Sequence, residues 1–195
     1  IYYKSISIKE GNYQVDLNTI NSSINNNNLS DSDNNKINNS ICSCDDIEDL
    51  AKYAYYNYIL NNYFNQTIDN IKNRIKKVKG NILDNNSTYK ILDDIGTLKE
   101  ILNAIKNIMI TIICNSDYID SITANIDEIQ NTLDNANLKK KPIDLYQEFS
   151  NIKSKVSQTI QYEICQLFNN IKETLVPNCT EKQLQPLVYY IELNI

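Results

Sequence analysis

The residues of this 195-residue chain that could do chemistry most directly are its cysteines, namely Cys42, Cys44, Cys114, Cys165 and Cys179. Thiols form disulfides in oxidising compartments, whereas in a reducing cytosol they stay free or bind metal. Five cysteines are many for a reduced intracellular domain. We therefore predict two disulfides and one free cysteine, with buried reduced thiols as the alternative.

A zinc site is a weaker prediction for the same cysteines. The Cys42-Ser43-Cys44 segment lacks the Cys-x2-Cys spacing of zinc knuckles, and the chain has no second close cysteine pair and no histidine. The lack of histidine also removes Ser–His and Cys–His nucleophiles and the Glu-x-x-His di-iron motif. We predict no metal, no cofactor and no catalytic residue.

Carboxylates are the main chemistry that remains. Asp45, Asp46, Glu48 and Asp49 cluster at the start of a predicted helix, where the helix dipole favours acidic side chains. Other acids lie beside apolar stripes, as expected of solvated helix faces. An enzyme that uses a pair of carboxylates stays an alternative, but we do not expect an enzyme.

Basic residues concentrate in two segments that are far apart in the sequence. One falls in the last turns of the first predicted long helix and the other in a link between later helices. The basic residues are Lys72, Arg74, Lys76, Lys77, Lys79, Lys139, Lys140 and Lys141. They form a candidate site for an anionic ligand, and the alternative is favourable charge at helix C-termini.

Tyrosines crowd the first half of the same predicted helix more densely than one buried stripe can hold. We expect some of them to face outward as contact residues, since tyrosine offers a large area at a low entropic cost. The candidate interface residues are Tyr53, Tyr55, Tyr56 and Tyr63. The alternative is packing against the rest of the fold.

Seven Asn-x-Ser/Thr triplets are candidate glycosylation sites, and they begin at Asn21, Asn28, Asn38, Asn65, Asn85, Asn86 and Asn178. Asparagine is frequent throughout the chain, as is isoleucine, which is typical of an AT-rich genome. The triplets therefore add only modest support to a location in the secretory pathway or at a surface.

The elements that must position these residues are mostly helices. Four segments from Cys42 onward have helical periodicity, with caps at Asp45 or Asp46, near Ser87 and at Ser116, and a start at Pro142. Their short links favour an antiparallel up-down four-helix bundle. This topology places all five cysteines at one end and the basic residues at the other, and we expect Cys42 or Cys44 to pair with Cys179, and Cys114 with Cys165.

Both ends of the chain read differently. Residues 1–18 alternate around Gly11 and predict a β-hairpin, residues 19–40 are an Asn-rich linker or loop, and the alternation from Leu187 to Ile195 predicts a strand. The fold class is thus mainly α, or α+β, with a bundle flanked by a small sheet. Residues 41–195 would form the bundle and the strand, and the whole chain one domain.

The predicted function is a non-catalytic binding or interaction domain of a secreted, cell-surface or virion-surface protein, with a host-facing role as one form of it. A structural assembly subunit is the second alternative, and a homo-oligomer would fit it. The formal net charge of −5 argues against a nucleic-acid partner. The longest apolar run, 108–114, is far short of the roughly 18 to 20 residues that span a bilayer. We expect a protein partner or receptor, and membrane attachment only through a segment outside this chain.

Overall fold

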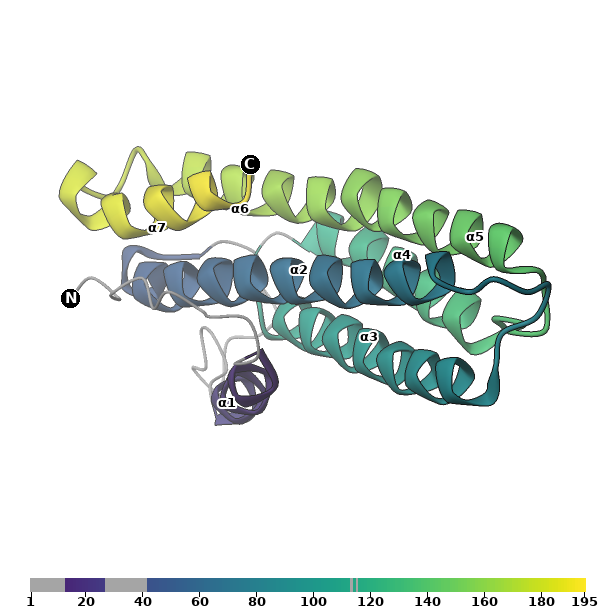
Figure 1. Cartoon of the computed structure of the whole chain (residues 1–195). Helices are drawn as coiled ribbons and strands as arrows, with labels where there is room; N and C mark the ends of the chain where they lie inside the picture. The colour runs from purple at the N-terminus through teal and green to yellow at the C-terminus, as the bar shows by residue number, and fades with distance from the viewer. Residues whose placement is uncertain (1–12, 27–41, 113, 115) are drawn as a thin grey trace.

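The computed structural model describes residues 13–26, 42–112, 114 and 116–195, and these residues are almost entirely helical (Figure 1). The elements in chain order are α1 (Tyr13–Asn26), a 3-10 turn η1 (Cys44–Asp46), α2 (Ile47–Lys76), α3 (Asn85–Thr111), α4 (Ser116–Asp134), α5 (Pro142–Lys155), a π-helical turn η2 (Val156–Gln161), α6 (Tyr162–Leu175) and α7 (Glu181–Leu193). The mainly helical prediction is confirmed. The predicted β-sheet is wrong, since no strand occurs among the residues that the structure describes.

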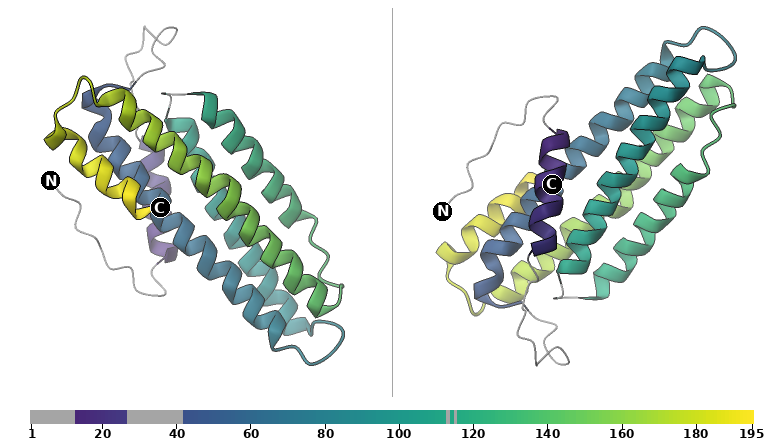
Figure 2. Two further views of the ribbon diagram at one scale, coloured as in Figure 1. Left: turned by 90° about the horizontal axis from the view of Figure 1, so that it is seen from above. Right: turned by 90° about the horizontal axis from the view of Figure 1, so that it is seen from below.

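The four predicted bundle helices correspond to α2, α3, α4 and the rod formed by α5, η2 and α6, which run side by side in alternating directions (Figures 1 and 2). α2 is the central helix and packs against α3, α5 and α7. Local signals set the starts of these helices. The Asp84 side chain accepts a hydrogen bond from the Ser87 N–H at 2.6 Å and caps α3, and Pro142 occupies the first turn of α5.

The π turn η2 keeps the long fourth rod in contact with the core. The rod has a buried stripe whose members are four residues apart, namely Ile152, Val156, Ile160 and Ile164. In a regular α-helix each step of four rotates the stripe by about 40°. The wider turn at η2 absorbs this rotation, so that Val156 and Ile160 stay buried.

The C-terminal strand prediction is wrong, because residues 187–193 belong to α7. The alternation that suggested a strand overlaps a helical stripe of Leu184, Leu187, Tyr190 and Ile191, all buried. Thr180 and Gln183 also form a reciprocal capping box before this stripe. Packing of this stripe against α2 favours the helix over the predicted strand.

The predicted N-terminal hairpin is wrong where the structure describes it, because residues 13–18 belong to α1; residues 1–12 lie outside the described residues. α1 also takes in residues 19–26 of the predicted Asn-rich linker, and 27–40 lie outside the description. Leu17, Ile20 and Ile24 form its buried face, with helical spacing. α1 crosses the bundle obliquely over α2 and α3 (Figure 2).

Candidate functional site

Two cysteine pairs lie at disulfide distance at one end of the bundle. Cys42 pairs with Cys114 and Cys44 pairs with Cys179, with Cα–Cα distances of 5.3 and 5.7 Å. They link the segment before α2 to the residues that follow α3 and to the connection between α6 and α7. We call this the disulfide end.

The prediction that Cys42 or Cys44 pairs with Cys179 is confirmed, with Cys44 as the partner, and the predicted pairing of Cys114 with Cys165 is wrong. Cys165 lies in α6, which continues to Leu175, nearly three turns further on, so Cys165 is not at the disulfide end. Its Sγ donates a hydrogen bond to the Asn194 carbonyl oxygen at 3.2 Å. Burial raises the pKa of this free thiol, which disfavours the reactive thiolate.

The acidic residues have structural partners. The Asp46 carboxylate accepts a hydrogen bond from the Ser43 N–H at 2.7 Å within a capping box at η1. Asp127 pairs with Lys106 at 2.6 Å, and Glu128 pairs with Lys155. Within the described ranges no three His, Cys, Asp or Glu side chains gather as metal ligands would. These carboxylates therefore form surface ion pairs and a helix cap.

Asp94 is a partly buried carboxylate of α3 that faces a cation. Burial raises the pKa of Asp94, and Arg74, whose Nε lies 3.6 Å from Asp94 Oδ2, acts in the opposite direction. The pair joins the last turns of α2 to α3. Arg74 is thus turned toward a neighbouring helix and away from the surface where we expected an anionic ligand.

The predicted tyrosine interface does not form an exposed patch. Tyr53 and Tyr55 are buried, and Tyr56 and Tyr63 are half-buried. α1 and α7 cover them: Tyr13 stacks on Tyr63 with ring centroids 5.0 Å apart, and Tyr190 contacts Tyr55 at 5.1 Å. α1 and α7, which were not predicted from the sequence, therefore cover tyrosines that we expected to be exposed.

The candidate glycosylation sites differ in accessibility. Asn85, Asn86 and Asn178 are exposed, while Asn21 and Asn65 are half-buried within helices. Thr67, which completes the triplet of Asn65, is buried in α2. Asn28 and Asn38 lie outside the described residues. Asn85 and Asn86 begin α3, and Asn178 lies at the disulfide end.

The two basic segments meet at the end of the bundle opposite the disulfides (Figures 1 and 2). We define the basic tip as residues 76–84 and 135–144. An open hollow of about 570 Å³ lies between these segments, and Lys76 and Lys141 both line it. Its other lining residues are Ile75, Val78, Gly80, Asn81, Pro142, Ile143 and Tyr146.

The basic tip has a charge opposite to that of the whole chain. It holds six lysines and two aspartates, hence a net charge of +4, in a chain of net charge −5. Lys140 pairs with Glu148, and this hydrogen bond raises the pKa of Lys140. The other five lysines are exposed and form no ion pair with any described residue; they are Lys76, Lys77, Lys79, Lys139 and Lys141.

Short-range contacts hold the shape of the tip. The Lys139 N–H donates to Asn137 Oδ1 at 3.0 Å, which orders the turn between α4 and α5. Lys72 Nζ lies 5.0 Å from the centroid of the Tyr146 ring and so joins α2 to α5 beside the hollow. Lys72 therefore supports the wall of the tip. Sequence reasoning placed the lysines at one end but missed Tyr146 and Ile143, which carry no signal until α5 is brought against α2.

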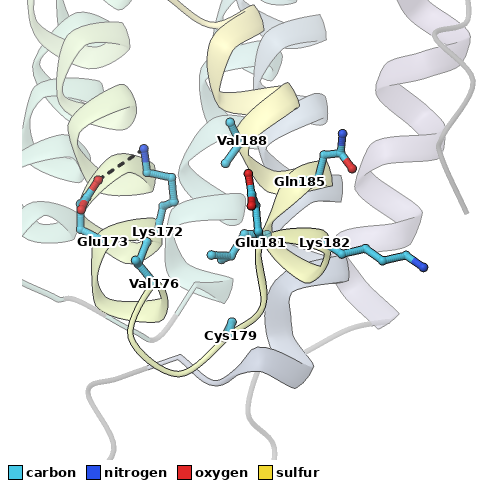
Figure 3. Close-up of a pocket in the computed structure, with 9 residues that line it drawn as sticks. Lys172, Glu173, Val176, Cys179, Glu181, Lys182, Gln185 and Val188 are labelled. Atoms are coloured by element: carbon cyan, nitrogen blue, oxygen red, sulfur yellow. Dashed lines mark ion pairs between the residues drawn. The ribbon is translucent and has the colours of Figure 1, made fainter.

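A larger hollow of about 830 Å³ lies between α6 and α7 near the disulfide end (Figure 3). Val176, Leu184 and Val188 give it an apolar wall, and Cys179 lies at its base. Its charged residues are of both signs, and Lys172 pairs with Glu173 at 3.4 Å. This mixture of apolar, positive and negative side chains does not favour one class of ligand. This hollow was not predicted, because residues 187–193 were expected to form a strand and not part of α7.

Comparison with protein-family models, with curated proteins and with solved structures yields no match for this chain. No helix among the described residues has the length and apolar character needed to cross a bilayer. The functional argument therefore depends on the geometry of the two ends of the bundle.

Proposed function

We propose that this chain is a non-catalytic binding domain of a secreted or surface-exposed protein, and that it contacts an anionic partner through the basic tip. The observation that carries the proposal is the gathering, at one end of an acidic chain, of five exposed lysines without ion-pair partners among the described residues. Two of them, Lys76 and Lys141, line one hollow. Like charges brought together cost folding energy unless a counter-charge meets them, and an anionic partner supplies it.

The disulfide end supports the extracellular part of the proposal. Disulfides persist in oxidising compartments and are rare in the cytosol. Two cysteine pairs at disulfide distance fit such a compartment, as does the exposed triplet at Asn178, which lies away from the basic tip. A clamped end also limits fraying of the helices, so that the opposite end keeps a fixed shape for recognition.

Retention on immobilised heparin tests the tip as an anion-binding surface. We expect the protein to be retained at low salt, and the Lys76→Glu, Lys141→Glu variant to elute near the void volume, because both lysines line the tip hollow. Lys172→Glu with Lys182→Glu is the matched control, since both lysines line the hollow at the other end. Loss of retention in the control alone, or in neither variant, would contradict the proposal.

Intact mass of the natively produced protein, with and without reductant, tests the compartment. After alkylation in denaturant without reductant we expect one thiol, Cys165, to be modified, and five after reduction. Deglycosylation should lower the mass if Asn178, which lies away from the basic tip, carries a glycan. Five alkylated thiols before reduction would place the chain in a reducing compartment and remove this part of the proposal.

A further inference from the structure

The basic tip also carries exposed aliphatic side chains. Ile143 is 76% exposed and Ile82 is 68% exposed, more than any other described aliphatic residue except the C-terminal Ile195. Ile143 follows Pro142 at the start of α5, and Ile82 lies in the connection between α2 and α3. Two exposed isoleucines from separate segments thus lie at the same end of the molecule as the unpaired lysines.

Their exposure has no structural explanation within the bundle. Each has a buried neighbour in the chain that serves the core, Leu83 beside Ile82 and Leu145 near Ile143. Exposed aliphatic side chains at the same end of the molecule as unpaired lysines suit a contact that combines apolar and anionic groups. The contact must combine an apolar phase with negative charge.

We propose that the basic tip docks on the surface of an anionic phospholipid bilayer, with Ile82 and Ile143 inserted among the acyl-chain boundary and the lysines at the phosphates. This inference rests on the proposed function and names its partner. Lysines near an anionic surface and buried aliphatic area are the two contributions that hold peripheral proteins on membranes. Lys76 and Lys141 both line the hollow of the basic tip, where a lipid headgroup would contact both ammonium groups.

A sulfated glycan and a nucleic acid fit the tip less well. Either would use the lysines, and Tyr89, which is 72% exposed near the start of α3, offers a ring on which a base would stack. Ile82 and Ile143 have no role in such a contact. In the bilayer complex the long bundle would stand on its basic tip, with the disulfide end directed away from the membrane (Figure 1).

Vesicle flotation tests this docking with the full chain. The probes are vesicles of phosphatidylcholine alone and of phosphatidylcholine mixed with phosphatidylserine. We expect binding to the mixed vesicles only, weakened by salt. The Lys76→Glu, Lys141→Glu variant should lose at least about 25-fold in partition coefficient, since each lysine contributes about fivefold. The Ile82→Ser, Ile143→Ser variant should lose about tenfold or more from its lost apolar burial.

The matched controls lie at the other end of the bundle. Ile110→Ser with Val176→Ser removes two exposed aliphatic side chains away from the tip, and Lys172→Glu with Lys182→Glu reverses two lysines there. Both should bind as the unmodified chain does. Circular dichroism of every variant confirms that the helices are retained.

The outcomes separate the two proposals. Retention on heparin without binding to mixed vesicles would overturn the membrane inference and leave the anion-binding tip in place. Full vesicle binding by the isoleucine variant would overturn insertion and hence the inference. Absence of both heparin and vesicle binding would overturn the inference together with the proposed function.

Discussion

The phenol of Tyr53 is an example of how single residues in this protein depend on their surroundings. The side chain is fully buried in α2, and burial, followed by Asp49 and Tyr56, raises its pKa from 10.0 to about 12. Burial disfavours the charged phenolate because the low-dielectric interior does not solvate it. At the residue scale the core therefore sets chemistry as well as stability.

The raised pKa of Tyr53 predicts an alkaline weakness. The folded state binds the phenolic proton more tightly than the unfolded state, so its contribution is fully present below pH 10 and is lost as the pH rises from 10 to about 12. Urea denaturation measured across this range should show a falling free energy of unfolding. The Tyr53→Phe variant should lose less stability over the same range, and an identical decline in both proteins would contradict the assignment.

Leu102 tests the apolar stripe of α3. Its side chain is fully buried, so Leu102→Asp places a charge in the core. This variant should unfold the domain or lower its free energy of unfolding by about 3 kcal/mol or more. The matched control is Leu92→Asp in the same helix, where the side chain is 51% exposed. Thermal melts followed by circular dichroism check both, and a stable, folded Leu102→Asp protein would contradict the stripe.

At the scale of elements, polar groups fix how α7 sits on α2. The Asn194 side-chain amide donates to the Ala54 carbonyl oxygen at 3.1 Å and to the Tyr190 carbonyl oxygen at 2.7 Å, and its oxygen accepts from Asn57 Nδ2 at 3.4 Å. Asn57 and Asn194 are both buried. Buried polar groups must be hydrogen-bonded, so this cluster specifies one register between the two helices.

Removal of that cluster should loosen the C-terminal helix. Asn194→Ala leaves buried groups of α2 without partners and should lower the free energy of unfolding by about 1–3 kcal/mol. The exposed Asn73→Ala variant, also helical, serves as the control and should change stability little. Urea denaturation gives both values, and hydrogen exchange should show the loss concentrated in α7. Equal stability of the two variants would mean that apolar packing alone positions α7.

At the scale of the whole molecule, the two ends of the bundle differ in their side chains and cross-links. The disulfide end joins three connecting regions, while the basic tip keeps its loops free of cross-links. The cross-links thus lie at the end opposite the surface that we propose for recognition. Variation of the tip loops need not disturb the packed core, which is the usual way in which binding residues are carried on a rigid scaffold.

The Cys44–Cys179 disulfide should stabilise the protein mainly by lowering the conformational entropy of the unfolded chain, because it closes a segment with a sequence separation of 135. Replacing both cysteines by serine should lower stability by about 2–4 kcal/mol. Denaturation of this variant is compared with that of Cys165→Ser, which leaves both disulfides in place. If the two variants are equally stable, Cys44 and Cys179 do not form a disulfide in the native protein.

The sequence by itself determined the four bundle helices and the placement of lysines and most cysteines at opposite ends. This was possible because helical periodicity, caps and short links are local, and the stripes of α3 and of the α5–α6 rod are long enough to be unambiguous. Chain ends were not determined, since the short apolar sets in α1 and α7 fit two periods and only burial against α2 and α3 selects the helical one.

Only the tertiary structure decided the cysteine partners, the covering of the tyrosines and the composition of the tip. A disulfide depends on where two α-carbons meet in space, and sequence spacing allows several pairings of five cysteines. Likewise, Ile82 and Ile143 gain meaning only when the connection after α2 and the start of α5 lie at one end of the bundle. Contacts between residues far apart in the chain are set by packing, which no local pattern encodes.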